Sequence, residues 1–466
     1  MKNFFVWFVG KDTINVTAFK HFFCLNMLVM LSSPLVAQIF LAPGGAVNDY
    51  KDEFSIDSFP IKVSGLPAQI NYAFGLSKIC FSITHPRVSD LKVELVSPDG
   101  SSIWLSNRNG GINGSGYANT CFRSNGFNGY IHQGIAPFEG EFIPDGRLEF
   151  INNNQNPNGI WYLLVRDLKT GLTGQLHIVS LEFGSNPMPG LGEAPCSIKT
   201  YANCQCGSRN KSKKQKCVLL PDLIVLGKFT QNQISEYAWD DPNYPGQLRF
   251  AVSVANIGAG PMETFGKGEW VCGTNPVNDS AQICPDGQFP RQKIYQRVFE
   301  LKKQKLEWTD REAGTNYFDN KPGHDHYHVD NWVVFRLIKN DTDDKGNPVF
   351  LKVAQSEKVS YCLFDSGACT NNDGLCAWNG RVFGEKNLVN YGFGTYASCK
   401  SGKQGISVGG YDTYGMLYEG QFIQLPKNLP SGEYLLEVEI DPEKKYLEED
   451  RSNNTYCQSV FISKQQ

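Results

Sequence analysis

Three histidines stand at alternate positions in one short segment of the chain. They are His324, His326 and His328, three of the seven histidines in the sequence. Alternate residues of a β-strand face the same side, so this spacing would gather three imidazoles on one face of a strand. Imidazole nitrogens suit Zn, Cu, Fe or Ni, and Cu(II) has the highest intrinsic affinity among these divalent ions. The segment therefore predicts a metal site with copper as the favoured ion; the alternative is three half-exposed histidines at a strand edge.

Cysteine usage predicts that the chain folds in an oxidising compartment. Fourteen cysteines are present and several lie close together, which favours disulfides over free thiols. The expected pairs are Cys272 with Cys284, Cys362 with Cys369, Cys80 with Cys121, and Cys376 with Cys399. Once Cys24 of the expected leader and the four cysteines of residues 188–220 are set aside, Cys457 is left over.

The N-terminus has the features of a secretory signal peptide. Lys20 and His21 precede an apolar run, residues 22–36, that ends in small residues near Ala37. The run is interrupted by polar residues and by Pro34, and it falls short of the about 20 apolar residues that span a bilayer. We therefore expect a cleaved leader over residues 1–37 and a secreted or cell-surface protein without a membrane span.

Charge and composition narrow the class of protein further. The 44 basic and 47 acidic residues give a net charge of −3, so the chain lacks the positive field that nucleic-acid-binding proteins normally carry. The 46 glycines and 24 prolines are typical of short strands joined by turns. The length of 466 residues exceeds the about 300 residues at which a single core stops growing. We expect several all-β domains and no nucleic-acid partner.

Residues 41–187 are expected to form the first domain. Short alternations of apolar and polar residues, separated by turn residues, indicate antiparallel β-structure. Two stretches, THPRVSDLKVELVSPDG (84–100) and NPNGIWYLLVRD (156–167), resemble the P domain, the β jelly-roll that follows the protease in proprotein convertases. The resemblance implies a jelly-roll that serves stability or surface attachment and has no chemistry of its own.

Residues 188–220 are expected to form a linker. It contains Cys196, Cys204, Cys206 and Cys217 on either side of a lysine-rich run. A zinc site is the alternative, but the spacing of these cysteines fits no recognised metal pattern and a secreted chain favours disulfides. We therefore expect a linker that is cross-linked by disulfides.

Residues 221–464 are expected to form a second all-β domain. PDLIVL and LRFAVSVANIGAGPM at its start, and YLLEVEIDP and EEDRSNNT at its end, resemble the two ends of an immunoglobulin-like β-sandwich. The insert between these ends is long, rich in Gly, Asn, Tyr and Cys, and poor in strand periodicity. Long loops inside a compact domain are uncommon unless they carry function, so we expect the site in this insert.

Four segments of the second domain resemble the lysyl oxidase catalytic domain, in the same order and at compatible spacing. They are HDHYH (324–328), EKVSYCLFD (357–365), QGISVGGYDTY (404–414) and the stretch from GQFIQLP to EEDRSNN (420–454). The resemblance implies that His324, His326 and His328 bind copper. It also implies that Tyr414 is oxidised to a quinone and joined to Lys358 as lysine tyrosylquinone, whereas Tyr411, the first tyrosine of YDTY, is not the cofactor residue.

Asp412 is the candidate for the base that removes a proton from the substrate carbon. It stands two residues before Tyr414, so the two side chains share a face if the segment is extended. A carboxylate that works as a base near neutral pH needs its pKa raised by burial. The alternative role for Asp412 is a hydrogen bond in a turn or strand.

Two further features follow from the resemblance. Animal lysyl oxidases have cysteines where this chain has Gly323, Gly410 and Gly420, which brings it closer to bacterial members of the family. The family's sandwich also binds calcium, and the matching positions here are Asp222, Asp450 and Asn453. The alternative is that these three residues cap turns.

Together these features predict a secreted copper-dependent amine oxidase. It would use O2 to convert lysine ε-amino groups, peptidyl or free, or related primary amines to aldehydes, with release of NH3 and H2O2. A different class of protein, a noncatalytic surface adhesion module with a structural metal, is the alternative. A zinc hydrolase that uses the same histidines is disfavoured because no glutamate stands beside the cluster.

Overall fold

The computed structural model describes residues 37–465 apart from positions 53, 112, 189–193, 208–215, 303–304, 321–325, 343–344, 346, 358 and 400–401. Residues 1–36, which contain most of the expected leader, lie outside the described residues. The chain is all-β, as predicted, and α1 (Gly227–Asn232) is the one α-helix within the described ranges. No helix among the residues described is long and apolar enough to cross a membrane.

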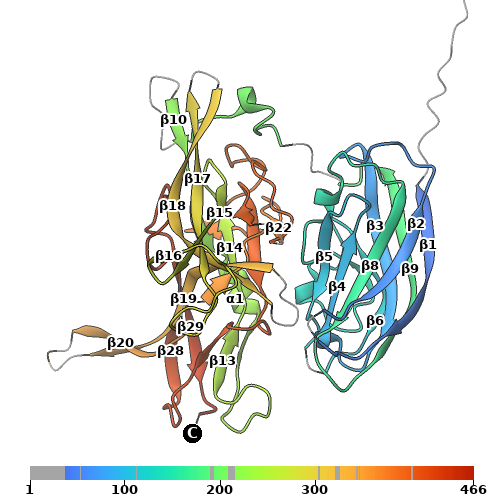
Figure 1. Ribbon diagram of the computed structural model, residues 1–466. Helices are drawn as coiled ribbons and strands as arrows, with labels where there is room; N and C mark the ends of the chain where they lie inside the picture. The colour runs from blue at the N-terminus through green and yellow to red at the C-terminus, as the bar shows by residue number, and fades with distance from the viewer. Residues whose placement is uncertain are drawn as a thin grey trace, which may run out of the picture. The chain divides into compact units, whose positions relative to one another are not determined.

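Two sheets make up the N-terminal part of the chain, which is coloured blue to green in Figure 1. One has the strand order β1-β9-β3-β6-β7 and the other the order β2-β8-β4-β5. Phe81 of β3, Trp161 of β8 and Phe183 of β9 belong to one apolar cluster, so the two sheets bury a shared core as in a sandwich. The strands are β1 (Gln38–Val47), β2 (Asp57–Val63), β3 (Phe74–Thr84), β4 (Leu91–Val96), β5 (Ser102–Asn107), β6 (Tyr117–Phe122), β7 (Gly140–Phe142), β8 (Gly159–Asp167) and β9 (Gly174–Ser185).

The period-two pattern of the sequence explains how these strands bury one face. In β8, Trp161, Leu163 and Val165 are fully buried, while the alternate residues Ile160 and Tyr162 are exposed. The indole N–H of Trp161 donates to the carbonyl oxygen of Pro157 at 2.8 Å. The largest side chain of this core therefore has its one polar atom satisfied.

The C-terminal part is built around one large sheet. Its main path is β16-β15-β17-β18-β19-β28-β29, and β10, β20, β21 and β25 pair with members of that path. Two smaller sheets have the orders β11-β14-β26-β22 and β12-β13-β27. Val254 of β14, Ile423 of β27 and Leu436 of β28 belong to one apolar cluster, so the three sheets share a core.

The strands of this part are as follows: β10 (Lys216–Leu219), β11 (Leu223–Val225), β12 (Ile234–Glu236), β13 (Gln247–Phe250), β14 (Val252–Asn256), β15 (Met262–Cys272), β16 (Asn275–Val277), β17 (Arg291–Lys302), β18 (Lys305–Asp319), β19 (His326–Thr342), β20 (Pro348–Gln355), β21 (Val359–Tyr361), β22 (Gly367–Ala368), β23 (Ala377–Trp378), β24 (Arg381–Val382), β25 (Lys403–Ile406), β26 (Gly410–Tyr414), β27 (Phe422–Gln424), β28 (Gly432–Ile440) and β29 (Thr455–Ile462).

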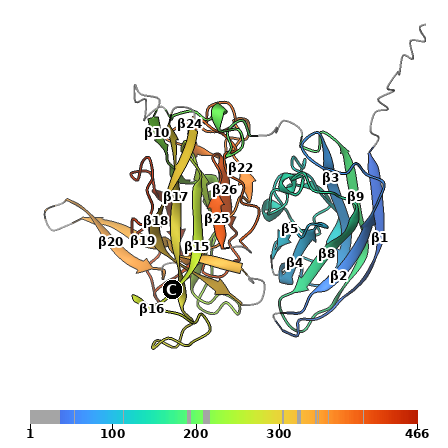
Figure 2. The same cartoon turned by 45° about the horizontal axis from the view of Figure 1, so that its top comes forward.

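The insert of the second domain is more regular than its hydropathy indicates. Its sequence is poor in strand periodicity and indicated long loops, but β17, β18 and β19 are long strands that pair with one another. Alternate side chains of β17 are buried over most of its length, and Gln292 and Gln296 occupy inward positions. Polar residues at inward positions hide the period-two pattern. Figure 2 shows β20 running out from the sheet alongside the end of β19.

The expected linker, residues 188–220, ends in a strand of the large sheet. β10 pairs with β17, where Cys217 lies opposite Leu301. The disulfides Cys196–Cys204 and Cys206–Cys217 close two short loops in this stretch. The prediction that these four cysteines form disulfides is therefore confirmed.

Two of the other expected disulfides are present and two are wrong. The structure contains Cys80–Cys121 and Cys272–Cys284, as predicted. It joins Cys362 to Cys399 and Cys369 to Cys376, which replaces the expected pairs Cys362–Cys369 and Cys376–Cys399. Cys369 is 7 residues from Cys376 and equally far along the chain from Cys362, so spacing alone cannot select the partner. Among the cysteines that the structure describes, Cys457 has no disulfide partner.

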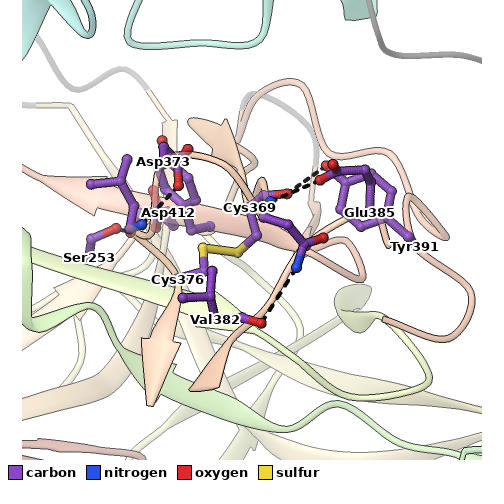
Figure 3. Close-up of a disulfide and its surroundings, with 12 residues drawn as sticks. Ser253, Cys369, Asp373, Cys376, Val382, Glu385, Tyr391 and Asp412 are labelled. Carbon is purple, nitrogen blue, oxygen red and sulfur yellow. Dashed lines mark hydrogen bonds between the residues drawn. A yellow bond between two sulfur atoms is a disulfide. The ribbon is translucent and has the colours of Figure 1, made fainter. Parts of the chain in front are cut away.

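The loop closed by Cys369 and Cys376 is held from several sides (Figure 3). The hydroxyl of Tyr391 donates to the carbonyl oxygen of Cys369 at 2.9 Å. The amide N–H of Asn371 donates to Glu385 Oε2 at 3.0 Å. The backbone of Cys369 also donates to the carbonyl oxygen of Gly409, one residue before β26. The disulfide loop is thus attached to the strand that carries YDTY.

Candidate active site

His326 and His328 meet at the start of β19. Both side chains are buried, with 4 % of each residue exposed, and their Nε2 atoms lie 2.9 Å apart. With imidazole–metal bonds of about 2.0 Å, two nitrogens 2.9 Å apart subtend about 90° at one ion, so the pair fits neighbouring ligands of a single metal. His324 lies outside the described residues, and within the described part of the chain no group of three His, Cys, Asp or Glu side chains is arranged to hold a metal.

Strand β18 supplies the outer contacts of this histidine pair. Tyr317 is the neighbour of His328 in the β18–β19 ladder, and Asp319 is the neighbour of His326. The Nδ1 atom of His328 lies 3.4 Å from the Tyr317 hydroxyl and 3.9 Å from Asp319 Oδ2. Burial, together with the charge of Asp319, raises the pKa of Tyr317 to about 12. Groups of this kind orient ligating imidazoles through the ring nitrogen that does not face the metal.

Tyr414 ends β26 and is held by the backbone of Cys362. Its ladder neighbour in β14 is Val252, and its hydroxyl oxygen accepts a hydrogen bond from the Cys362 N–H at 2.5 Å. Only 8 % of the residue is exposed. Burial, and next the nearby carboxyl of Asp412, raise the pKa of Tyr414 well above its ordinary value near 10, so its phenol is neutral in the folded protein.

Tyr411 faces away from Tyr414. The two tyrosines are three positions apart in an extended strand, which places their side chains on opposite faces. In agreement, Tyr411 belongs to an apolar cluster with Ile224 and Phe229, whereas Tyr414 packs in the main cluster of the large sheet.

The histidine pair and Tyr414 line the same pocket. Ser360, Phe364, Thr413, Tyr418 and Glu419 also line it. Two motifs that lie more than eighty residues apart in the sequence are thus brought to one place. β21 pairs with the histidine strand β19, where Tyr361 is opposite Val329, and the next residue, Cys362, donates its N–H to the Tyr414 hydroxyl.

Lys358 lies outside the described residues, but the chain that follows it at once enters the site. β21 begins at Val359 and pairs with the strand that carries the histidines. Cys362, just after β21, donates its amide N–H to Tyr414. The backbone next to position 358 is therefore tied both to the histidine strand and to the tyrosine.

Asp412 has a buried carboxyl group without a hydrogen-bond partner. The residue is 1 % exposed, and neither carboxyl oxygen accepts or donates a hydrogen bond within the described structure. Burial, and next the charge of Asp365, raise its pKa well above the ordinary value. The nearby backbone N–H of Thr413 acts in the opposite direction and lowers this pKa, and the backbone oxygen of Asp412 accepts a hydrogen bond from Ser253 Oγ at 3.1 Å.

Two residues of the site did not stand out in the sequence. Tyr361 stacks on Tyr414 with 3.7 Å between ring centroids, and Asp365 is fully buried, which raises its pKa to about 6. Asp365 accepts the N–H of Ser407 at 2.8 Å. The chain contains 20 tyrosines and 47 acidic residues, so residue type alone could not single out Tyr361 or Asp365. The feature of the sequence that pointed to them was their position in the segment EKVSYCLFD.

Asp222, Asp450 and Asn453 converge on a second pocket of about 280 Å³. Glu449 and Ser452 also line this pocket. The side-chain amide of Asn453 donates to Asp222 Oδ1 at 2.6 Å, while Asn453 Oδ1 is buried without a hydrogen-bond partner in the described structure. The site therefore offers one buried, unsatisfied oxygen beside several carboxylates.

Two of the glycines that replace family cysteines are explained by their surroundings. An added Cβ at Gly410 would lie 2.1 Å from Asp365 Oδ1, and Gly420 has a φ of +77°, which favours glycine. Gly323 lies outside the described residues. A cysteine at position 410 would require the Asp365 carboxyl to move.

Comparison with known proteins places two family domains in the chain. Residues 293–466 match the lysyl oxidase family, and residues 78–135 match the proprotein convertase P-domain family. Human protein-lysine 6-oxidase is 29% identical over 132 residues, which are 28% of this chain and 25% of that protein. Human lysyl oxidase homolog 1 is 34% identical over 132 residues, which are 28% of this chain and 18% of that protein.

The aligned part is thus a quarter or less of these two relatives. A crystal structure of the Aeromonas sobria serine protease with its chaperone aligns at 19% identity over 33% of this chain and 27% of that one, with a TM-score of 0.21, which is too low to bear on the fold. The chain therefore has a C-terminal lysyl oxidase domain and an N-terminal proprotein convertase P-domain, and it is a distant homologue of the lysyl oxidases.

Proposed function

We propose that the C-terminal domain is a copper-dependent amine oxidase. Its substrates would be lysine ε-amino groups, peptidyl or free, or related primary amines, which it would convert to aldehydes with release of NH3 and H2O2 at the expense of O2. The observation that carries this proposal is the shared pocket of His326, His328 and Tyr414. It brings a nitrogen pair with the spacing of metal ligands to the same place as a buried tyrosine.

The residues at hand fit the proposed metal. His326 and His328 would bind copper through Nε2, together with His324, because their Nε2 atoms are at the 2.9 Å separation of neighbouring ligands and nitrogen ligands suit copper. Tyr317 and Asp319 lie on the Nδ1 side of His328 and would keep its ring turned toward the ion.

Tyr414 and Lys358 would form the lysine tyrosylquinone. When formed, this group supplies an electron sink that ordinary side chains lack. The Cys362 N–H holds the Tyr414 oxygen at 2.5 Å, and position 358 precedes β21 directly. Both features favour a cross-link between these two residues over one that uses another lysine.

Asp412 would act as the base that takes a proton from the carbon next to the substrate amine. A carboxylate is a stronger base when its pKa is raised, and burial raises the pKa of Asp412. Because its two carboxyl oxygens have no hydrogen-bond partner in the described structure, either is available to a proton. Its charge also acts on Tyr414, two residues along β26, although Asp412 is not among the residues that line the pocket shared by Tyr414 and the histidines.

We further propose that the protein works outside the cell. The six disulfides among the described residues are typical of oxidising compartments.

The name of the relative protein-lysine 6-oxidase favours protein-bound lysine as the substrate class. In addition, a calcium ion bound by Asp222, Asp450 and Asn453 would stabilise the folded domain. Calcium prefers oxygen ligands, and Asn453 Oδ1 is such an oxygen, buried and unsatisfied.

The proposed activity can be tested together with its cofactor. Copper-loaded full-length protein should release H2O2 on addition of amine, and tryptic digestion should yield one species that contains both Lys358 and Tyr414. Tyr414→Phe should abolish both signals. Tyr411→Phe is the matched control and should keep both, because its ring faces another cluster. Parent protein that binds copper but forms neither product would instead favour the noncatalytic adhesion module.

Copper binding tests the histidine pair separately from turnover. His326→Ala and His328→Ala should each weaken copper binding by more than about 100-fold, since even an outer-shell partner is worth about 10–100-fold. Competition with a chromophoric chelator on metal-free protein measures this. His177→Ala, at an exposed position of β9, is the control, and equal affinities in all four proteins would exclude this pair as ligands.

Asp412→Asn should change stability and activity in opposite directions. The folded chain keeps a proton on Asp412 that the unfolded chain releases above about pH 4, because the folded pKa is raised. The free energy of unfolding of the parent protein therefore falls as the pH rises through this interval, by up to about 1.4 kcal/mol per pH unit. The variant has no proton to lose at this position, so its stability relative to the parent should rise as the pH is raised above about 5.

Urea denaturation of both proteins over a series of pH values from about 5 upward measures the difference, which includes the effect of Asp412 on Asp365 because the two carboxyls are coupled. Amine turnover of the variant should fall by about 100-fold or more, as for loss of a general base. A stability difference that does not depend on pH would contradict the raised pKa of Asp412.

Calcium should raise the melting temperature of the metal-free protein. Binding that is specific to the folded state adds about 2.7 kcal/mol at 100 times the dissociation constant. Asn453→Ala should remove the calcium-dependent shift, and Asp279→Asn, at an exposed acidic position of the same domain, should keep it. A shift that survives in Asn453→Ala would place the ion elsewhere.

A further inference from the structure

Tyr361 lies flat against Tyr414. Their ring centroids are 3.7 Å apart and their planes differ by 9°. Aromatic pairs in proteins usually have centroids about 4.5–7 Å apart, in offset or edge-to-face arrangements, because the negative faces of two rings repel each other. Two electron-rich phenols in such a close parallel stack therefore need to be held there by other contacts.

Two consecutive residues hold Tyr414 from different directions. Tyr361 covers one face of its ring, and Cys362 donates its N–H to the hydroxyl oxygen at 2.5 Å. The disulfide Cys362–Cys399 fixes one side of this dipeptide. The pairing of Tyr361 with Val329 in the β21–β19 ladder fixes the other side. The plane and the in-plane orientation of the Tyr414 ring are thus set by the same short segment.

Tyr361 is itself fixed at its hydroxyl. The side-chain amide of Gln421 donates to Tyr361 Oη at 2.7 Å, and both residues are fully buried. Tyr418 contacts the Tyr414 ring with its planes at 73° and centroids 5.7 Å apart, which is an edge contact. Of the three tyrosines around this pocket, Tyr361 is the one that stacks on Tyr414.

We infer that Tyr361 is a positioning residue for the cofactor proposed at Tyr414: it fixes the plane of that ring and becomes its electron-rich stacking partner after oxidation. The inference rests on the proposed function. A quinone ring is electron-poor, so the repulsion between two phenol faces gives way to attraction between a phenol face and a quinone face. The stack is therefore more favourable with the oxidised ring than with the tyrosine that precedes it.

The test compares Tyr361→Phe and Tyr361→Leu with the parent chain, all as full-length, copper-loaded protein. Phenylalanine keeps the stacked ring but is a weaker electron donor, whereas leucine removes the ring. Tyr446→Leu is the matched control, because Tyr446 is 3 % exposed and packs on Trp332 in the same domain. The measurements are the visible absorption band of the quinone, the rate at which the peptide species containing both Lys358 and Tyr414 appears, and the melting temperature.

We expect the absorption band to move to shorter wavelength in Tyr361→Phe and further in Tyr361→Leu, because a weaker donor stabilises the excited state less. Cross-link formation should slow by about tenfold or more in Tyr361→Leu, since displacement of reacting groups by about 1 Å can cost about 100-fold. It should stay near the parent rate in Tyr361→Phe. Tyr446→Leu should change only the melting temperature.

A parent-like band and parent-like cross-linking in folded Tyr361→Leu would overturn the inference and leave the proposed function intact. If the leucine variant does not fold, an unshifted band in Tyr361→Phe overturns it in the same way. A parent protein that forms no cross-link at all overturns both proposals, so the two failures are distinguishable.

Discussion

The hydrogen bond from the Cys362 N–H to the Tyr414 hydroxyl joins the two halves of the site. One half is the end of β26, which belongs to a small sheet. The other half follows β21, which pairs with the histidine-bearing strand β19 of the large sheet. The stack of Tyr361, in β21, on the Tyr414 ring is a second contact between the same two halves. The disulfide Cys362–Cys399 restrains Cys362, the residue that donates the hydrogen bond to Tyr414.

Burial determines the electrostatics of the site. Asp412 and Tyr414 are nearly inaccessible to water, and the pKa of each is raised because the charged form would lose its hydration. A buried carboxyl without a hydrogen-bond partner destabilises a fold. Here this group lies on the strand that ends at Tyr414. The unsatisfied oxygen of Asn453 is a second case of the same kind.

Much of this arrangement could be predicted from local patterns. The all-β class followed from turn residues and period-two runs, and the shared face of His326 and His328 followed from their spacing. Long strands such as β17 were missed because Gln292 and Gln296 take inward positions in it. The disulfides Cys362–Cys399 and Cys369–Cys376 were also missed. Cys369 is equally far along the chain from Cys362 and from Cys376, so the spacing offered no reason to prefer one partner.

The sequence by itself determined which side chains are present and which of them share a face of a strand, because side-chain direction alternates along an extended backbone. Only the tertiary structure decided which strands lie together, and hence that Tyr361 stacks on Tyr414, that Cys362 pairs with Cys399, and that the carboxyl of Asp412 is buried near that of Asp365. These features depend on contacts between residues far apart in the chain. Such contacts arise from the packing of the whole core, and no local period encodes them.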